Sequence, residues 1–135
     1  MPEDRNKAGW ETMRAIHDEV ADATVRAMQG VAPDMGEMIV NFAFGEIYAR
    51  PGLDLKTRQI CTVAMLAAMG AQTTPQLKAH IRGALNVGWT RQEIVEVLMQ
   101  SAVYAGFPSA LSALAVAKKV FDDADKHSQQ EKKEP

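Results

Sequence analysis

Cysteine, surplus positive charge and long apolar runs are what this 135-residue chain lacks. Cys61 is its single cysteine, so no disulfide can form within the chain. Its 15 Lys and Arg residues stand against 17 Asp and Glu residues, whereas a nucleic-acid-binding protein normally carries a basic excess that neutralises phosphates. The longest uncharged stretch, 101–117, is shorter than the roughly 20 apolar residues that a membrane span needs, and Gly106 and Pro108 interrupt it. These absences disfavour nucleic-acid partners, membrane partners and a disulfide-stabilised fold.

The first ten residues, MPEDRNKAGW, are charged and have no apolar core, so we expect no secretory signal. A chain with one cysteine and no signal is typical of the reducing cytoplasm, and we expect a cytoplasmic protein. Its length suits one domain, which we place at 1–125. The last ten residues, KHSQQEKKEP, offer too little apolar surface to offset the entropy of ordering. We therefore expect residues 126–135 to form a disordered charged tail.

Helical periodicity runs along nearly the whole chain and strand alternation hardly occurs, which predicts an all-α fold of six helices. Two helix starts carry capping signals. Asp54 can cap one helix, and Thr90 with Glu93 forms a capping box for another. The predicted helices end at glycines or before prolines. They cover approximately 9–28, 33–49, 55–69, 74–88, 90–105 and 108–125.

Two of these helices lack an ordinary polar face. Residues 60–69 are apolar around the whole circumference, and the 90–105 helix keeps only a narrow polar strip of Glu93, Glu96 and Gln100. A helix without a polar face must be covered on all sides, and a small domain can bury one such helix but hardly two. We therefore predict a homo-oligomer with closed rotational symmetry. The alternative is a compact monomer with an apolar centre.

Glu46 is the most informative candidate for a functional residue. On an α-helical wheel it falls in the apolar stripe of its helix, among residues that include Phe42 and Ala43. Burial of a carboxylate disfavours its charged form or demands a partner, and both outcomes are frequent at functional sites. The alternative is a structural ion pair with an arginine from another element, either Arg50 or Arg58.

His80 has a similar position near the edge of the apolar arc of its helix. Gly83 and Ala84 give it small neighbours, and an imidazole in such a place could serve as a general acid. The alternative is a histidine of the core or of an interface. Cys61 lies in an apolar run, where a thiol usually behaves as a small hydrophobe, and only Arg58 is near enough in sequence to activate it.

Metal and phosphate chemistry find no support in the sequence. The three histidines, His17, His80 and His127, are far apart, and no pair has the spacing of two metal ligands on one helix. His17 adjoins the charged pair Asp18–Glu19, which we interpret as an exposed face. No glycine-rich phosphate loop follows a strand, because no strand is predicted. We expect neither a metal nor a cofactor.

Three segments in succession resemble the carboxymuconolactone decarboxylase family. The first is FGEIYARPGLDLKTR at 44–58, and the second is QLKAHIRGALNVG at 76–88. The third joins EIVEV at 93–97 to YAGFP at 104–108. The resemblance extends over 41–121 in matching order and spacing, and three linked segments are far more specific than any one of them.

The resemblance implies a six-helix, alkylhydroperoxidase-D-like bundle assembled into a ring-like trimer or hexamer. It also implies cofactor-free loss of CO2 from 4-carboxymuconolactone, or from a related lactone or β-keto acid. The product would be 3-oxoadipate enol-lactone, in the β-ketoadipate pathway of aromatic catabolism. Peroxidases of the wider superfamily use a CxxC followed by a histidine on the same helix. Here the histidine position is His80, and the two cysteine positions hold Thr73 and Gln76.

The resemblance also implies roles for individual residues. His80 would donate the proton, and Glu46 would orient the imidazole or relay its proton. Two alternatives remain: a redox protein that uses Cys61, and a non-catalytic helical oligomer that binds a small molecule. The mechanism requires that Glu46 and His80 converge on one enclosed chamber. Further side chains would hold carboxylate or line the pocket: Arg50, Arg58, Tyr48, Trp89 and Tyr104.

Overall fold

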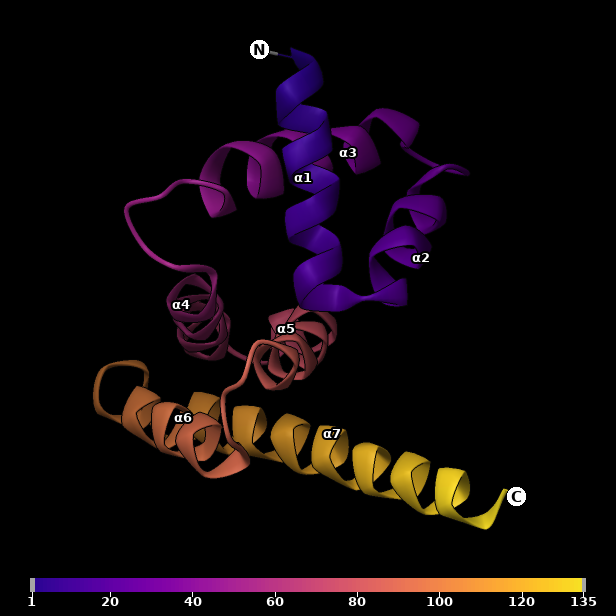
Figure 1. Ribbon diagram of the computed structural model, residues 1–135. Coiled ribbons are helices and arrows are strands. Elements are labelled where there is room, and N and C mark those ends of the chain that lie inside the picture. Colours follow the sequence, from indigo (N-terminus) through magenta and orange to yellow (C-terminus); the bar gives the residue numbers. More distant parts are fainter. Residues whose placement is uncertain (1, 135) are drawn as a thin grey trace. The chain divides into compact units, whose positions relative to one another are not determined.

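A computed structural model describes residues 2–134 of the chain. Over those residues it contains seven α-helices, a π-helix and a 3₁₀ turn, and no strand, so the all-α prediction is confirmed (Figure 1). The chain divides into two compact units, residues 1–59 and 60–135, where the sequence predicts one domain over 1–125. Each unit is described below by itself.

The first unit begins with α1 (Pro2–His17) and α2 (Glu19–Met28), where the sequence predicts one helix over 9–28. That prediction is wrong because Asp18 adopts a left-handed conformation, with φ 50° and ψ −129°, and interrupts the helix. The interruption lets α1 pack against η1 while α2 packs against α3. Helix α1 buries Met13 and Ile16, whereas α2 buries Ala21 and leaves Val20 exposed, so the buried face changes position at the break.

The predicted 33–49 helix is present, but it consists of two kinds of helix. After α3 (Pro33–Met38), which begins with proline as expected, the chain continues as the π-helix η1 (Ile39–Tyr48). A π-helix bonds each residue to the one five positions away, so residues five apart share a face. An α-helical wheel does not place residues five apart on one face, so it misses neighbours such as Asn41 and Glu46.

Two glycines bring α1 and η1 into close contact (Figure 1). A Cβ atom at Gly9 would overlap the main-chain carbonyl of Val40, and one at Gly45 would overlap the carbonyl of Arg5. No other residue type leaves room for the facing backbone at these two positions. The two contacts set α1 in a defined register along the π-helix.

The second unit holds most of α4 (Leu55–Ala68), the short η2 (Ala71–Thr73), α5 (Thr74–Asn86), α6 (Arg91–Ala105) and α7 (Phe107–Lys133). The capping box of α6 is confirmed: the Glu93 amide donates to the Thr90 hydroxyl, and the Glu93 carboxylate accepts from the Thr90 amide. Helices α4, α5 and α6 end near glycines with positive φ. The buried core of this unit comprises Val63, Ala67, Leu77, Ile81, Ala84, Ile94, Leu98, Ala113, Ala117 and Val120.

Helix α7 extends beyond its predicted end at residue 125, and it runs alongside α6 (Figure 1). The segment expected to be a disordered tail, 126–135, is helical as far as Lys133. A pair one turn apart favours this extension, because Nε2 of His127 lies 3.1 Å from Oε1 of Glu131. The segment is also rich in good helix formers, and these local terms do not depend on a buried face.

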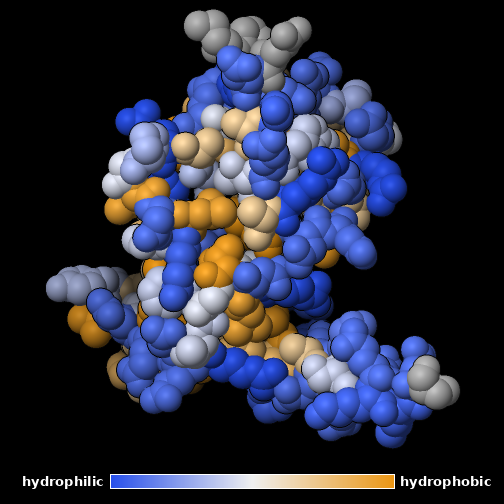
Figure 2. All heavy atoms as spheres, viewed as in Figure 1, coloured by the Kyte–Doolittle hydropathy of each residue, from blue (hydrophilic) through white to orange (hydrophobic). Residues whose placement is uncertain are grey.

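Hydrophobic side chains reach the surface in many places, as the orange spheres in Figure 2 show. In the second unit the exposed ones include Met65, Met69, Met99, Val103, Tyr104, Phe107 and Leu111. Among the described residues, no helix combines the length and the apolarity that crossing a bilayer requires.

Candidate functional site

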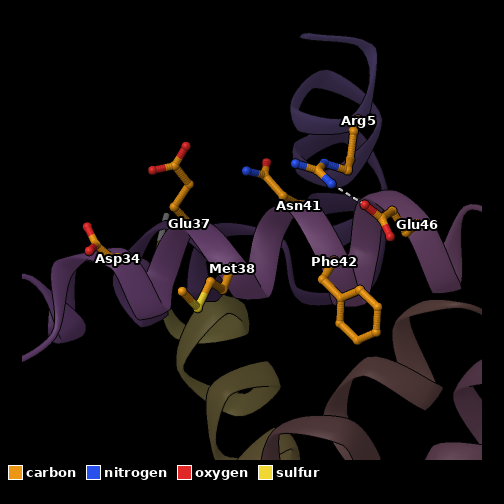
Figure 3. Close-up of a pocket in the computed structure, with 7 residues that line it drawn as sticks. All are labelled: Arg5, Asp34, Glu37, Met38, Asn41, Phe42 and Glu46. Atoms are coloured by element: carbon orange, nitrogen blue, oxygen red, sulfur yellow. Dashed lines mark hydrogen bonds and ion pairs between the residues drawn. The ribbon is translucent and has the colours of Figure 1, made fainter. Parts of the chain in front are cut away.

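Glu46 lies on η1 with 41% of its side chain exposed, and its Oε1 atom forms an ion pair with Nη1 of Arg5 (Figure 3). It shares a face with Asn41, five residues earlier, as the π-helical period requires. The expectation that Glu46 is buried in an apolar stripe is wrong because its side chain is exposed, although Phe42, expected beside it, lines the same hollow. The alternative, an ion pair with an arginine from another element, describes the structure correctly, although the arginine is neither Arg50 nor Arg58.

The Arg5–Glu46 pair lies at one end of a surface hollow of about 470 Å³ (Figure 3). A second contact joins α1 to η1, because Asn6 Nδ2 donates to Asn41 Oδ1 at 2.8 Å. The hollow carries three carboxylates and one guanidinium, so its net charge repels a dianion. It cannot by itself be the site of a dicarboxylate substrate. Its lining residues are Arg5, Asp34, Glu37, Met38, Asn41, Phe42 and Glu46.

Phe44 stands between two rings in the same unit. Its ring centroid lies 5.8 Å from that of His17, edge to face, and 5.0 Å from that of Tyr48. His17 is buried, with 8% of its surface exposed, although the sequence placed it beside an exposed face. Burial lowers the pKa of His17, and the nearby Asp18 carboxylate opposes that change only in part. His17 follows the buried Met13 by four residues, which puts both on one face of α1. This spacing is the sequence signal that indicates the burial of His17.

Arg50 and Arg58, both predicted to bind carboxylate, are close to each other at the loop between η1 and α4. Arg58 Nη2 donates to the main-chain carbonyl of Arg50 at 3.2 Å. Between them Asp54 caps α4 as predicted, because its Oδ1 accepts from the Thr57 amide at 2.7 Å. Hydrogen bonds from the main chain and the side chain of Thr57 lower the pKa of the Asp54 carboxyl below its ordinary value. Arg50 is exposed and Arg58 is half-buried.

His80 lies on α5, half-buried, in a helix whose buried side chains include Leu77 and Ile81. Gly83 and Ala84 are buried as well, so its neighbours on that helix are small, as the sequence predicts. Trp89 is half-buried and packs against the core of the same unit. The catalytic role of His80 stays a prediction.

Tyr104, predicted to line a pocket, is 96% exposed on α6. It borders a second hollow, of about 320 Å³, formed by α4 and α6. Neither His80 nor Trp89 is among the residues that line this hollow. The lining is mostly small and apolar: Ala64, Ala68, Val97, Gln100, Ser101, Tyr104 and Ala105.

Of the two positions that hold redox cysteines in peroxidases of the superfamily, Thr73 has a structural role here. Thr73 is buried, and its hydroxyl donates to the carbonyl of Leu66 at 2.7 Å, which connects the end of α4 to the start of α5. Gln76 is exposed. Cys61 is a free, half-buried thiol on α4. A CxxC exchange reaction has no second thiol in this chain.

Comparison with known proteins decides the family. The family model described as the carboxymuconolactone decarboxylase family matches residues 33–119, which is more than half of the chain. The chain belongs to this family. Within the match lie all the residues that sequence analysis singled out for the site, whereas Arg5, Gly9 and His17 lie before it.

Three known proteins are 33% to 39% identical to this chain over the aligned segments. A 4-carboxymuconolactone decarboxylase of Acinetobacter baylyi is 33% identical over 90% of both chains. A 15.0 kDa protein of Paracoccus denitrificans, named for the nqo9–nqo10 intergenic region, is 33% identical over 88% of this chain and 89% of its own. A nitrosuccinic acid decarboxylase of Metarhizium robertsii is 39% identical over 64% of this chain and 59% of its own. Two of the three are named as decarboxylases.

Proposed function

We propose that this protein is a cytoplasmic, cofactor-independent decarboxylase that converts 4-carboxymuconolactone to 3-oxoadipate enol-lactone and CO2, in aromatic catabolism. The observation that carries the proposal is the 33% identity to a 4-carboxymuconolactone decarboxylase across 90% of both chains. The match to the family model over 33–119 supports the same reaction class.

The proposed reaction breaks the bond between the ring carbon and its carboxylate. The electron pair left by CO2 moves through the ring double bond to the lactone carbonyl, and negative charge develops on that oxygen. A proton then adds to the ring carbon beside the carbonyl, which completes the balance. The enzyme must therefore supply a proton, a donor to the developing oxyanion and a binding site for the carboxylates.

The second named decarboxylase among the relatives acts, by its name, on nitrosuccinic acid. That compound also carries a carboxyl group beside an electron-accepting group, here a nitro group. Loss of CO2 would place the electron pair on the nitro oxygens, just as it reaches the carbonyl oxygen in the lactone. Stabilisation of an electron pair on an acceptor oxygen is thus the chemistry common to both substrates, and we propose it as the task of this site.

We assign proton donation to His80, and we assign to Glu46 either the orientation of the His80 imidazole or the relay of its proton. Glu46 is itself paired with Arg5, whose Nη1 donates to Oε1 of the carboxylate. We assign carboxylate binding to Arg58 and Arg50, because a guanidinium presents paired donors to a carboxylate. Tyr48, Trp89 and Tyr104 are proposed to line the substrate pocket.

We also propose that the enzyme is a homo-oligomer. Support comes from exposed apolar residues that lie four positions apart: Met65 on α4 with Met69 just after its end, and Met99 with Val103 on α6. Water contact with such helix faces is costly, and a second copy of the chain would remove it. Whether the ring holds three or six copies is open to measurement.

A direct assay tests the proposed activity. Purified protein is mixed with 4-carboxymuconolactone, and CO2 release and the change in ultraviolet absorbance are followed, with nitrosuccinic acid in parallel. Release of CO2 from the lactone is expected, and no release from either acid would refute the decarboxylase proposal. The variant Cys61→Ser should turn over at the wild-type rate, because the mechanism uses no thiol. Loss of turnover in that variant would favour the redox alternative.

A further inference from the structure

The Arg5–Glu46 ion pair joins the first helix of the chain to the acidic residue of the proposed site. We propose that Arg5 is a positioning residue: it holds the Glu46 carboxylate in its working orientation, so α1 completes a site whose family signature begins only at residue 33. The inference rests on the role proposed for Glu46. It adds to that role a residue from outside the family-matched segment.

Main-chain packing places Arg5 next to Glu46. The carbonyl of Arg5 faces Gly45 where a Cβ atom would overlap it, and the Arg5 Cγ atom would lie 3.0 Å from such a Cβ. The backbone and the side-chain stem of Arg5 therefore both lie against the residue that precedes Glu46. A guanidinium that starts from this anchored position has few conformations to lose when it pairs with the carboxylate.

The π-helix provides the matching register on the other side. Arg5 and Asn6 are adjacent on α1, and they contact Glu46 and Asn41, which are five residues apart on η1. Residues five apart align in a π-helix, whereas in an α-helix the aligned residues are three or four apart. The two polar contacts therefore depend on the unusual helix, which indicates that η1 serves to present Glu46 to α1.

The guanidinium of Arg5 has Glu46 as its hydrogen-bond acceptor. Its Nε atom is shielded from solvent without a hydrogen-bond acceptor, and Nη1 donates to Oε1 of Glu46. Without this contact Glu46, which is 41% exposed, could adopt several rotamers. With it, one carboxylate oxygen is bound and the other keeps a defined direction. A fixed acceptor of this kind is what orients an imidazole in a proton-transfer site.

The test compares four full-length proteins: wild type, Arg5→Gln, Glu46→Gln and the double variant. Exposed ion pairs contribute little to stability, so all four are expected to remain folded by circular dichroism. We expect Arg5→Gln to lower kcat about ten- to a hundredfold, with KM changed less than twofold, because misplacement of an orienting group affects the chemical step. Lys7→Gln on the same helix, where the side chain is 80% exposed, is the matched control.

Non-additivity is the decisive result. If Arg5 acts through Glu46, adding Arg5→Gln to Glu46→Gln should cause no further loss of kcat. Independent, multiplying losses would overturn the proposal, as would full activity of Arg5→Gln when Glu46→Gln is impaired. Arg5→Lys, which keeps the charge, should recover part of the lost kcat, and a variant no better than Arg5→Gln would count against an ion-pair role.

A measurement without substrate separates this inference from the proposed activity. The ¹³C carboxyl resonance of Glu46 is recorded in wild type, Arg5→Gln and Lys7→Gln. It should move in Arg5→Gln alone, because only that variant removes the paired guanidinium. A resonance that stays in place would overturn the positioning role. If the resonance moves but Glu46→Gln decarboxylates normally, the pair stands and the catalytic assignment of Glu46 fails.

Discussion

The carbonyl of Arg5 faces the α-carbon of Gly45 at a separation that excludes any side chain at residue 45. This contact explains why glycine precedes Glu46 in the signature FGEIYAR. A methyl group there would push α1 away from η1, and the guanidinium of Arg5 would move with it. The same glycine thus serves both helix packing and the geometry of the proposed site.

Replacement of Gly45 by alanine is therefore expected to destabilise the protein by about 1–3 kcal/mol, the usual cost of forcing an extra carbon into a packed interface. Urea unfolding monitored by circular dichroism measures this loss. Gly30→Ala is the matched control, because a Cβ atom at Gly30 would have no neighbour within 4 Å. Equal stability of the two variants would show that α1 and η1 do not approach as described.

His17 predicts a pH dependence of stability. Burial lowers its pKa in the folded state, so the unfolded chain binds more protons than the folded chain below the ordinary imidazole value of about 6.5. The His17 contribution to stability is then complete above that pH, and it is lost as pH falls from there toward the lowered pKa. Urea midpoints at pH 8 and pH 5 should differ less in His17→Gln than in wild type.

The control for that measurement is His127→Gln. His127 is 74% exposed on α7, where its imidazole lies 3.1 Å from Glu131. Its removal should leave the loss of stability between pH 8 and pH 5 nearly as large as in wild type. A decrease of equal size in both variants would contradict a special contribution from His17.

His80 is expected to be required for turnover. In His80→Gln, kcat for CO2 release should fall by about 10²–10⁴, the usual contribution of a positioned general acid. The fold should persist, because His80 is only half-buried and glutamine is similar in size. His127→Gln again provides the control and should keep full activity. A folded His80→Gln variant with wild-type kcat would remove His80 from the mechanism.

The proposed oligomer depends on the exposed apolar residues of α6. Val103 is 71% exposed, and Val103→Lys would place a charge in the interface, so we expect a shift to smaller species in sedimentation velocity. Val31→Lys is the matched control, because Val31 is 79% exposed in the turn before α3. A wild-type protein that sediments as a monomer would refute the assembly.

Helix ends could be predicted well because their signals are local. The Asp54 cap, the Thr90–Glu93 box and the terminating glycines each act within four residues, and the structure confirms them. The end of α7 was predicted too early, because the prediction required a buried face. The His127–Glu131 pair, one turn apart, favours the longer helix without such a face.

The environment of Glu46 could not be predicted, for a different reason. Its partner Arg5 is 41 residues away along the chain, and the pairing needs a helix of non-standard period. No local propensity indicates a π-helix over Ile39–Tyr48, since its residues are compatible with an α-helix. The packing of α1 against Gly45 brings Arg5 next to Glu46, and the residues adjacent to Glu46 in the sequence do not indicate this packing.

The amino-acid sequence alone therefore determined the all-helical class, most helix boundaries and the family, because capping, periodicity and motif spacing are properties of neighbouring residues. The tertiary structure decided the turn at Asp18, the π-helical period of η1 and the choice of Arg5 as the partner of Glu46. The Arg5–Glu46 pair joins residues 41 positions apart, and α1 packs along η1. The free energy of such long-range contacts is gained only when the helices pack together.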